Sequence, residues 1–116
     1  MECPFCNMDR SKYLAENEYF YAIRDSSPFT RGHCLIVSKR HAEDFFELQP
    51  EEMGSLLKIS LQLRDILDSE YDPDGYNLLM NSGRAAGQSV FHFHLHFLPR
   101  HRKDGKFFGV LRRFVK

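Results

Sequence analysis

Hydrophobic and polar side chains alternate along the segment GQSVFHFHLHFLPR, which spans residues 87–100. Successive side chains of a β-strand point to opposite faces, so this alternation predicts a strand with one polar and one apolar face. The polar face would carry His92, His94 and His96. The opposite face, which we expect to pack on the core, would carry Phe91, Phe93, Leu95 and Phe97. Lys, Thr or Glu would suit a merely solvated face better than histidine, so three aligned imidazoles favour metal binding, acid–base work or nucleophilic catalysis.

Aromatic and β-branched residues predict further strands at residues 19–24, 32–38 and 76–80. Residues 12–16 are the expected hairpin partner of the first of these strands. A loop at residues 81–87 then leads into the histidine strand.

Apolar side chains recur at helical spacing from Pro50 to Tyr71 and predict one long helix whose stripe packs on the sheet. Pro50 suits the first position of a helix, and the Asp-Pro-Asp-Gly segment at residues 72–75 ends it. The residues assigned to the core are Met53, Leu56, Ile59, Leu63, Ile66 and Leu67. One shorter helical turn is expected at residues 44–48.

Length and composition indicate a single globular domain with its own core. The chain has 116 residues, and its sixteen basic and sixteen acidic side chains cancel, so net charge does not indicate a polyanionic partner. The sequence has no apolar run of membrane-spanning length and no apolar leader at its beginning. Three cysteines, two of them close together, fit a reducing compartment, and the expected location is the cytoplasm. The basic and aromatic tail at residues 100–116 can be either a solvated terminus or a phosphate-attracting segment.

Cys3 and Cys6 have the C-x2-C spacing of a zinc knuckle, in which two thiolates meet at one ion. The redox interpretation of the same spacing needs a thioredoxin-like βαβ pattern, which the sequence lacks, so metal binding is favoured. Zinc takes four ligands, so two more must come from elsewhere in the chain.

The loop before the histidines is suited to phosphate. Its small residues, Gly83, Ala85, Ala86 and Gly87, allow close backbone approach, and successive N–H groups can form an anion nest. Gln88 and Ser89 add side-chain donors. An unprotonated histidine nitrogen facing a phosphate held there could attack phosphorus and form a covalent intermediate, provided that its other ring nitrogen donates to a fixed acceptor.

Two other classes of function remain open from the residues alone. His92, His94 and His96 could surround a catalytic metal ion, although no acidic ligand follows them. The cysteine pair and the basic tail could instead belong to a module that binds nucleotide, RNA or protein. The neutral net charge of the chain counts against this interpretation.

The segment HFHLHFL resembles the His-φ-His-φ-His-φφ signature of the histidine triad (HIT) family of nucleotide hydrolases and transferases. The similarity continues through Asn81 and residues 86–90, and through the region from Gly32 to His41, in the order and spacing of the family. The resemblance implies an α+β fold, in which an antiparallel sheet of about five strands carries one main helix. It makes residues 1–116 a single HIT domain with an N-terminal zinc knuckle and a basic tail.

The resemblance also implies catalytic roles. His94 would be the nucleophile that becomes transiently nucleotidylated. His96 would orient His94 through its backbone carbonyl and would line the phosphate site. Ser89 and Gln88 would contact the phosphate or the leaving group.

Further matching positions imply how the nucleotide binds. Asp25 corresponds to the acid that binds the ribose, although it could also simply stabilise a turn. Ile23, with Phe5, is a candidate for the base pocket. Asn81, like Ser89 and Gln88, matches a position that contacts the phosphate or the leaving group, and Gly87 is also assigned to the nucleotide-binding site.

In the zinc-bearing branch of the family, the ligand positions correspond to Cys3, Cys6, His41 and His92, which would form a structural zinc site. The implied activity is hydrolysis or nucleotidyl transfer at the α-phosphate of a purine nucleotide, and the implied assembly is a homodimer joined edge to edge. Asn81 and Ser89 resemble the phosphoramidase branch. The Leu98-Pro99-Arg100 ending resembles the dinucleoside polyphosphate hydrolase branch, so both remain open.

Overall fold

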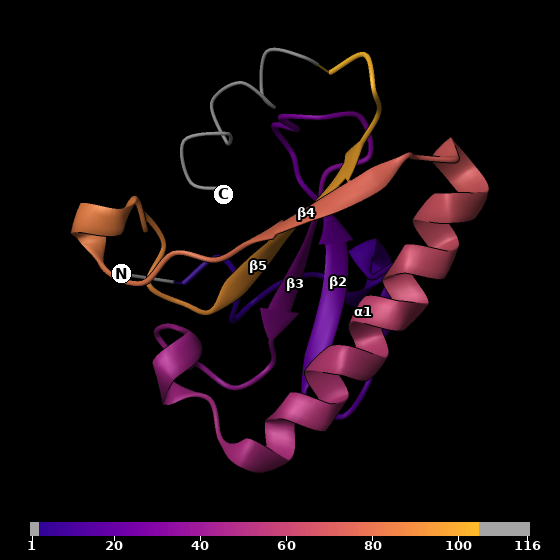
Figure 1. Cartoon of the computed structure of the whole chain (residues 1–116). Helices are drawn as coiled ribbons and strands as arrows, with labels where there is room; N and C mark the ends of the chain where they lie inside the picture. The colour runs from indigo at the N-terminus through magenta and orange to yellow at the C-terminus, as the bar shows by residue number, and fades with distance from the viewer. Residues whose placement is uncertain (1–2, 105–116) are drawn as a thin grey trace.

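A five-stranded antiparallel sheet with one long helix on one face forms the fold (Figure 1). The structure is a computed structural model, and it describes residues 3–104. In chain order the strands are β1 (Ala15–Glu16), β2 (Phe20–Arg24), β3 (Cys34–Ser38), β4 (Gly75–Leu79) and β5 (His94–Arg100). They are arranged in the order β1-β2-β3-β5-β4, so β5 lies between β3 and β4. The α+β fold with its five-stranded sheet is therefore confirmed.

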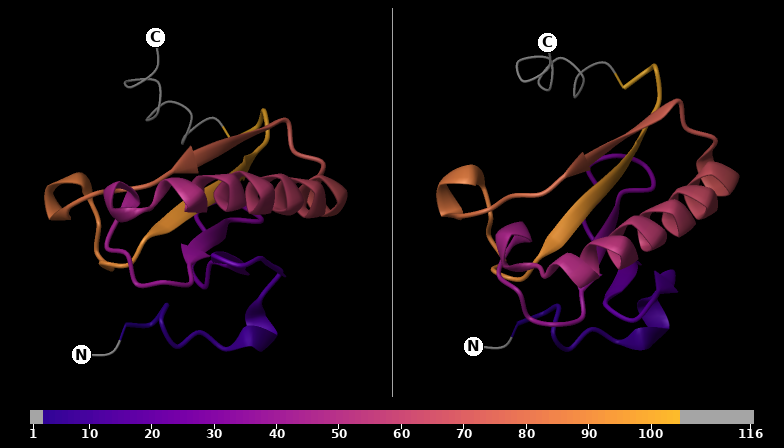
Figure 2. Two further views of the ribbon diagram at one scale, coloured as in Figure 1. Left: turned by 90° about the horizontal axis from the view of Figure 1, so that it is seen from below. Right: turned by 60° about the horizontal axis from the view of Figure 1, so that its bottom comes forward.

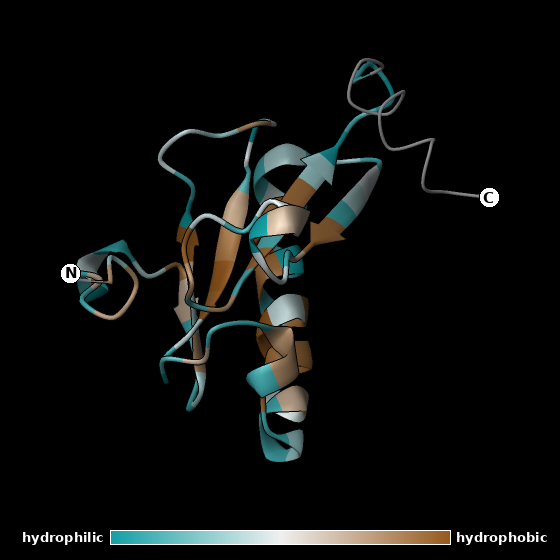
Figure 3. Ribbon diagram, turned by 90° about the vertical axis from the view of Figure 1, so that its left-hand side faces the viewer, coloured by the Kyte–Doolittle hydropathy of each residue, from teal (hydrophilic) through white to brown (hydrophobic). Residues whose placement is uncertain are grey.

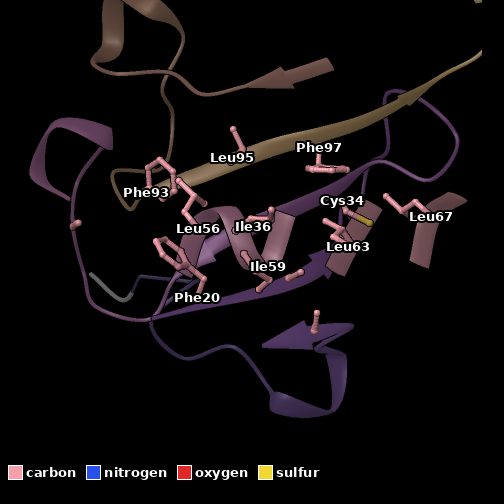
Figure 4. Close-up of a cluster of buried hydrophobic side chains, with 13 residues drawn as sticks. Phe20, Cys34, Ile36, Leu56, Ile59, Leu63, Leu67, Phe93, Leu95 and Phe97 are labelled. Atoms are coloured by element: carbon pink, nitrogen blue, oxygen red, sulfur yellow. The ribbon is translucent and has the colours of Figure 1, made fainter. Parts of the chain in front are cut away.

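Helix α1 (Pro50–Tyr71) has the bounds that the apolar spacing predicts. Its side chains Leu56, Ile59, Leu63 and Leu67 are buried against Phe20, Ile36, Leu95 and Phe97 of the sheet (Figure 4). Asp72 caps the end of the helix: its backbone is left-handed (φ 47°), and its N–H donates to the Asp68 carbonyl. Three short 3-10 helices complete the elements: η1 (Arg10–Lys12), η2 (Phe45–Glu47) and η3 (Arg84–Ala86).

The core assignment of Met53 is wrong, because Met53 is 38% exposed while its neighbour Glu52 is buried. Glu52 accepts a hydrogen bond from the Gln49 N–H at the helix start (2.7 Å) and pairs with Arg40 (2.8 Å). Glu52 is four residues from Leu56 and therefore lies on the same side of the helix. A paired carboxylate thus takes the buried position that the spacing assigned to a methionine.

The two faces of the sheet have different partners. On β2 and β3, one set of alternating side chains packs under α1, and the other set forms a second cluster of Tyr21, Ile23, Leu35 and Val37. Phe5, Met8 and Tyr13 of the N-terminal segment cover this second face. Figure 2 shows that segment well apart from α1, and Figure 3 shows hydrophobic residues concentrated on the strands between them. A side chain on the second face therefore lies between the sheet and the N-terminal segment.

The histidine strand is shorter than the alternation predicts, since β5 begins at His94. Phe93, Leu95 and Phe97 lie in the core as expected. Phe91 does not. It lies before the strand, half-buried beneath the Arg84 guanidinium (5.5 Å from the ring centroid). His92 also precedes the strand, so the three histidines do not form one continuous ridge.

The other predicted strands are confirmed with shifted ends. Of residues 12–16, Lys12 ends η1 and only Ala15–Glu16 form the strand that pairs with β2, while the Leu14 N–H also donates to the Ala22 carbonyl of β2. β3 starts at Cys34, after Gly32 at φ +86°, where an added Cβ would lie 2.7 Å from a Tyr71 ring carbon. Cys34 is fully buried, and burial raises the pKa of its thiol to about 11. The part of the basic tail beyond residue 104 lies outside the described residues.

Candidate active site and metal site

Four potential metal ligands from three parts of the chain meet at one end of the sheet. Cys3 and Cys6 lie in the N-terminal turn, where the Cys6 N–H donates to the Cys3 carbonyl. His41 follows β3, and His92 precedes β5. One donor atom from each of the four side chains lies within 4.8 Å of the others. The separations include 3.2 Å from Cys3 Sγ to His92 Nδ1 and 3.1 Å from Cys6 Sγ to His41 Nδ1.

His92 is already in the state that a metal ligand needs. Its Nε2 lies 2.6 Å from the Ser38 carbonyl oxygen, which can only accept, so Nε2 carries the proton and Nδ1 keeps its lone pair toward the cysteines. Burial lowers the pKa of this fully buried imidazole, which favours the neutral form that a metal ligand needs. Two thiols and two imidazoles at these distances fit zinc, which takes nitrogen and sulfur ligands in tetrahedral sites.

His94, the first residue of β5, has one ring nitrogen free for chemistry. Its Nδ1 lies 2.8 Å from the backbone carbonyl oxygen of His92, to which it donates its proton. In the neutral ring, Nε2 is therefore the unprotonated nitrogen. The orienting carbonyl belongs to His92, and the assignment of this role to the carbonyl of His96 is wrong. The reason is geometric: the chain bends before β5, which brings the His92 carbonyl to the imidazole two residues on.

His96 belongs to a hydrogen-bonded chain of side chains that also contains His33 and Asp25. His33 Nδ1 accepts the Phe29 N–H (3.0 Å), so the His33 proton is on Nε2. That proton faces His96 Nδ1 (3.0 Å) and Asp25 Oδ2 (3.4 Å). His96 Nδ1 is thus an acceptor, and its proton is on Nε2. Burial, followed by the neighbouring His94 and His33, lowers the pKa of His96 to about 4, so at neutral pH it is an uncharged donor.

A cavity of about 410 Å³ on the second face of the sheet brings the two histidines together with other predicted residues. The predicted site residues on its wall are Phe5, Ile23, Asp25, Ser89, His94 and His96. One end is apolar, because Phe5 and Met8 from the N-terminal segment face Ile23 and Leu35 of the sheet. The Phe5 ring lies 5.1 Å from the His94 ring, centroid to centroid. The cavity wall therefore carries both apolar and polar side chains, and His94 lies on it beside Phe5.

Three predicted residues, Asn81, Gly87 and Gln88, do not line this cavity. The Gln88 side chain is buried, where Oε1 accepts the Gly83 N–H (2.8 Å) and Nε2 donates to the carbonyls of Glu43 (2.6 Å) and Val90 (3.2 Å). Gly87 has φ +100°, and a Cβ there would meet the Asn81 amide. These residues shape the loop that carries Ser89.

Four N–H groups of the loop in which an anion nest is expected are used within the loop itself. The N–H of Gly83 donates to the Gln88 side chain, and those of Ala86, Gly87 and Gln88 donate to carbonyls of the same loop. Donors on the cavity wall include the Ser89 hydroxyl and the His96 Nε2–H.

His33 is the main site residue that the sequence did not reveal. It lies in line with Leu35 on the face that carries His96, since Leu35 pairs with His96 across β3 and β5. Period-two alternation would have placed it there only if the pairing of these two strands had been known. Lys12 and Ser26 also line the cavity and were not predicted.

The comparisons with known proteins agree with this fold. The HIT domain family matches residues 8–103, and the chain belongs to this family. It is 38% identical over 116 residues to the protein hit of Bacillus subtilis, covering 93% of this chain and 77% of that protein. It is 32% identical over 107 residues to adenylylsulfatase HINT3 of Arabidopsis thaliana, covering 89% of this chain and 54% of that protein.

Solved structures show the same architecture. A HIT-family member from Bacillus subtilis has a TM-score of 0.79 at 34% identity, covering 89% of this chain and 76% of that chain. A zinc-bound histidine triad family protein from Mycobacterium smegmatis has a TM-score of 0.72 at 36% identity, covering 80% of this chain and 68% of that chain. The diadenosine triphosphate hydrolase of Plasmodium falciparum shares the fold, with a TM-score of 0.78 at 23% identity. The match covers 84% of this chain and 66% of that chain.

Proposed function

We propose that this protein is a nucleotide hydrolase or nucleotidyl transferase that acts at the α-phosphate of a purine nucleotide through a covalent nucleotidyl-His94 intermediate. The observation that carries the proposal is the fixed tautomer of His94. Its Nδ1–H is held by the His92 carbonyl, so the nucleophilic Nε2 is available on the wall of a cavity large enough for a nucleotide.

The apolar and polar residues of the cavity wall suit different parts of a nucleotide. The base would lie in the apolar end beside Phe5 and Ile23. The ribose hydroxyls would donate to Asp25, whose carboxylate lines the same wall. The phosphate would lie at the polar end, where Ser89 and His96 provide donors for charge that develops during the reaction.

The reaction would proceed in two steps. His94 Nε2 attacks the α-phosphorus, the bond from phosphorus to the leaving group breaks, and its electron pair departs with that group. An amine leaving group takes up one proton, which we assign to solvent through the Ser89 hydroxyl. Water then attacks phosphorus, the P–N bond returns its electron pair to Nε2, and one proton is released. Gln88, Gly87 and Asn81 would assist by holding the Ser89 loop.

We propose that zinc at the cysteine–histidine site is structural. Cys3, Cys6, His41 and His92 would fill its four positions, so the ion would tie the N-terminal segment to both strand ends without a free coordination position. The same His92 that would bind zinc through its side chain holds His94 through its carbonyl. The family resemblance and the zinc-bound relative from Mycobacterium smegmatis support this assignment.

A catalytic metal held by the three triad histidines is the second candidate, and the contacts do not favour it. His92 directs Nδ1 to the cysteines and Nε2 to Ser38, and His96 Nδ1 accepts from His33. Within the described residues, His94 and His96 line the cavity and His92 does not, so the three imidazoles do not converge on one ion there.

We also propose a homodimer. β4 is the last strand of the sheet, so one of its edges is unpaired within the described residues. Leu78, Leu79 and Met80 at its end are 37–49% exposed, and a second copy could cover them. The reduced thiols of the proposed zinc site are consistent with the cytoplasm, and residues 1–116 would act as one domain. Within residues 3–104, no helix is both long and apolar enough to cross a membrane.

The function is tested by turnover of an adenosine phosphoramidate and a diadenosine polyphosphate, with and without a chelator. We expect at least one substrate to be cleaved at the α-phosphate, His94→Ala to lose turnover while still binding nucleotide, and chelator to leave the initial rate unchanged. Full activity in His94→Ala, or immediate loss of the rate on chelation in a protein that remains folded, would contradict the proposal.

A further inference from the structure

The loop before β5 is fastened to another part of the chain, residues 42–44, which we call the anchor segment. Three hydrogen bonds connect the two: the Ser82 hydroxyl donates to Asp44 Oδ2 (2.5 Å), the Gln88 amide to the Glu43 carbonyl (2.6 Å), and the Phe93 N–H to the Ala42 carbonyl (2.6 Å). The anchor segment therefore holds the loop near its start, its middle and its end.

The anchor segment is itself fixed, because η2 begins directly after it. Asp44 Oδ1 accepts the Phe46 N–H (3.0 Å) and so caps the first turn of η2. The Glu47 side chain reaches back and accepts the Glu43 N–H (2.8 Å). Ala42 is fully buried. A loop tied to this segment therefore has a defined position relative to the sheet.

The bond between Ser82 and Asp44 joins two side chains, whereas the other two connections end on backbone carbonyls. Its length of 2.5 Å is typical of a hydroxyl that donates to a carboxylate, which is stronger than a bond between neutral groups. Asp44 uses one carboxylate oxygen for η2 and the other for the loop. It thereby links the two elements directly.

From Ser82 the constraint reaches Ser89 through two further contacts. The next residue, Gly83, donates its N–H to Gln88 Oε1 (2.8 Å), and Gln88 Nε2 donates to the Val90 carbonyl (3.2 Å). Ser89 lies between Gln88 and Val90, so the same amide closes the turn that carries the Ser89 hydroxyl. Ser89 lines the 410 Å³ cavity and Ser82 does not, so Ser82 can act on a bound phosphate only through the loop.

We propose that Asp44 and Ser82 are positioning residues, whose hydrogen bond sets the place of the Ser89 hydroxyl against the phosphate. The inference rests on the proposed function, in which Ser89 donates to charge that develops during the reaction. A slightly displaced donor still contacts the bound nucleotide but stabilises the transition state less. Loss of the Ser82–Asp44 bond therefore lowers kcat more than it weakens nucleotide binding.

The test removes or restores one hydroxyl. Ser82→Ala removes the donor and leaves the Asp44 cap of η2 in place, and Ser82→Thr restores a hydroxyl. Ser60→Ala is the matched control, because this partly buried hydroxyl also donates to an oxygen, the Leu56 carbonyl (2.8 Å), on α1 and outside the cavity. For each variant, kcat is measured on an adenosine phosphoramidate, and Kd is measured for adenosine monophosphate by calorimetry. Ser82→Ala is also combined with Ser89→Ala.

We expect Ser82→Ala to lower kcat about tenfold, less than the roughly hundredfold loss that is typical when such a donor is removed altogether. Kd should change little, Ser82→Thr should recover most of the rate, and Ser60→Ala should keep it. Once Ser89 is alanine, Ser82→Ala should cost little more, because two residues that act through one contact are not additive. The amide NMR signals of Ser89 and Val90 should shift in Ser82→Ala and stay in place in Ser60→Ala.

Equal kcat in Ser82→Ala and Ser60→Ala would overturn the inference. So would the same fold loss from Ser82→Ala with and without the Ser89 hydroxyl, or unshifted Ser89 and Val90 signals in Ser82→Ala. If the wild-type protein cleaved neither an adenosine phosphoramidate nor a diadenosine polyphosphate, the proposed function itself would fail, whatever the NMR signals showed of the loop.

Discussion

His33 provides a sharp test of how the site is positioned, because its two ring nitrogens have separate partners. Nδ1 accepts the Phe29 N–H, and the Nε2–H faces His96 Nδ1, both at 3.0 Å. In Asn, the side-chain oxygen lies close to the position of Nδ1, so His33→Asn keeps the first contact and loses the second. In Gln, the amide nitrogen reaches the position of Nε2, so His33→Gln keeps a donor for His96.

The magnitude follows from the lost hydrogen bond. A buried hydrogen bond contributes about 1 kcal/mol net, and leaving His96 Nδ1 without a donor costs about 1–3 kcal/mol. His33 is only 6% exposed, so water cannot readily replace it. With its tautomer no longer fixed, His96 would present Nε2–H to the phosphate only part of the time. We expect kcat to fall about tenfold in His33→Asn, which corresponds to about 1.4 kcal/mol, and clearly less in His33→Gln.

Steady-state kinetics on an adenosine phosphoramidate would measure the rates, and nitrogen chemical shifts of the His96 ring would report its tautomer. The tautomer measurement separates positioning from a general loss of stability, which thermal unfolding of both variants would measure. A wild-type kcat in His33→Asn, or an unchanged Nε2–H tautomer of His96 in that variant, would refute the positioning of His96 by His33.

Three further predictions follow from named contacts. The Cys3→Ser, Cys6→Ser double variant should lose one tightly bound zinc per chain and melt at a lower temperature, because metal binding adds to the free energy of folding. Metal analysis and calorimetry would check this. Zinc that is retained by the double variant but lost from His94→Ala would contradict it. Asp25→Ala should weaken ribonucleotides and remove any preference over deoxyribonucleotides, which titration calorimetry would measure; an unchanged preference would remove Asp25 from the ribose site. The pKa of His96 is about 4 in the folded chain, below the ordinary 6.5, so the folded state binds fewer protons between these values and stability should fall as pH drops from 6.5 to 4. In the zinc-free double variant, His96→Asn should reduce this fall by on the order of 1 kcal/mol in denaturant titrations, and an equally steep fall would contradict the assignment.

The sequence predicted the sheet and α1 well because both depend on local periodicity. Alternation placed Leu95 and Phe97 correctly, and helical spacing placed Leu56 and Leu63 correctly. Strand ends and buried polar residues depend on distant partners instead. Glu52 is buried because Arg40 pairs with it, which the spacing within the helix could not indicate.

The sequence predicted which residues form the candidate site better than it predicted the hydrogen bonds between them. The cysteines and their two histidine partners meet as the family resemblance implies. The use of the Gln88 amide to hold its own loop, the role of the His92 carbonyl, and the contact between His33 and His96 all depend on tertiary geometry. The contact between His33 and His96 could have been derived only once the pairing of β3 with β5 was known.

Mass spectrometry of the protein during turnover tests covalent nucleotidyl transfer most directly. Wild-type protein mixed with an adenosine phosphoramidate would be quenched within one turnover and digested at neutral pH, since a phosphorus–nitrogen bond to histidine is labile in acid. We predict an added nucleoside monophosphate on the peptide that contains His94, absent from His94→Ala. Product accumulation with no adduct on the His94 peptide at any time point would contradict a nucleotidyl-His94 intermediate.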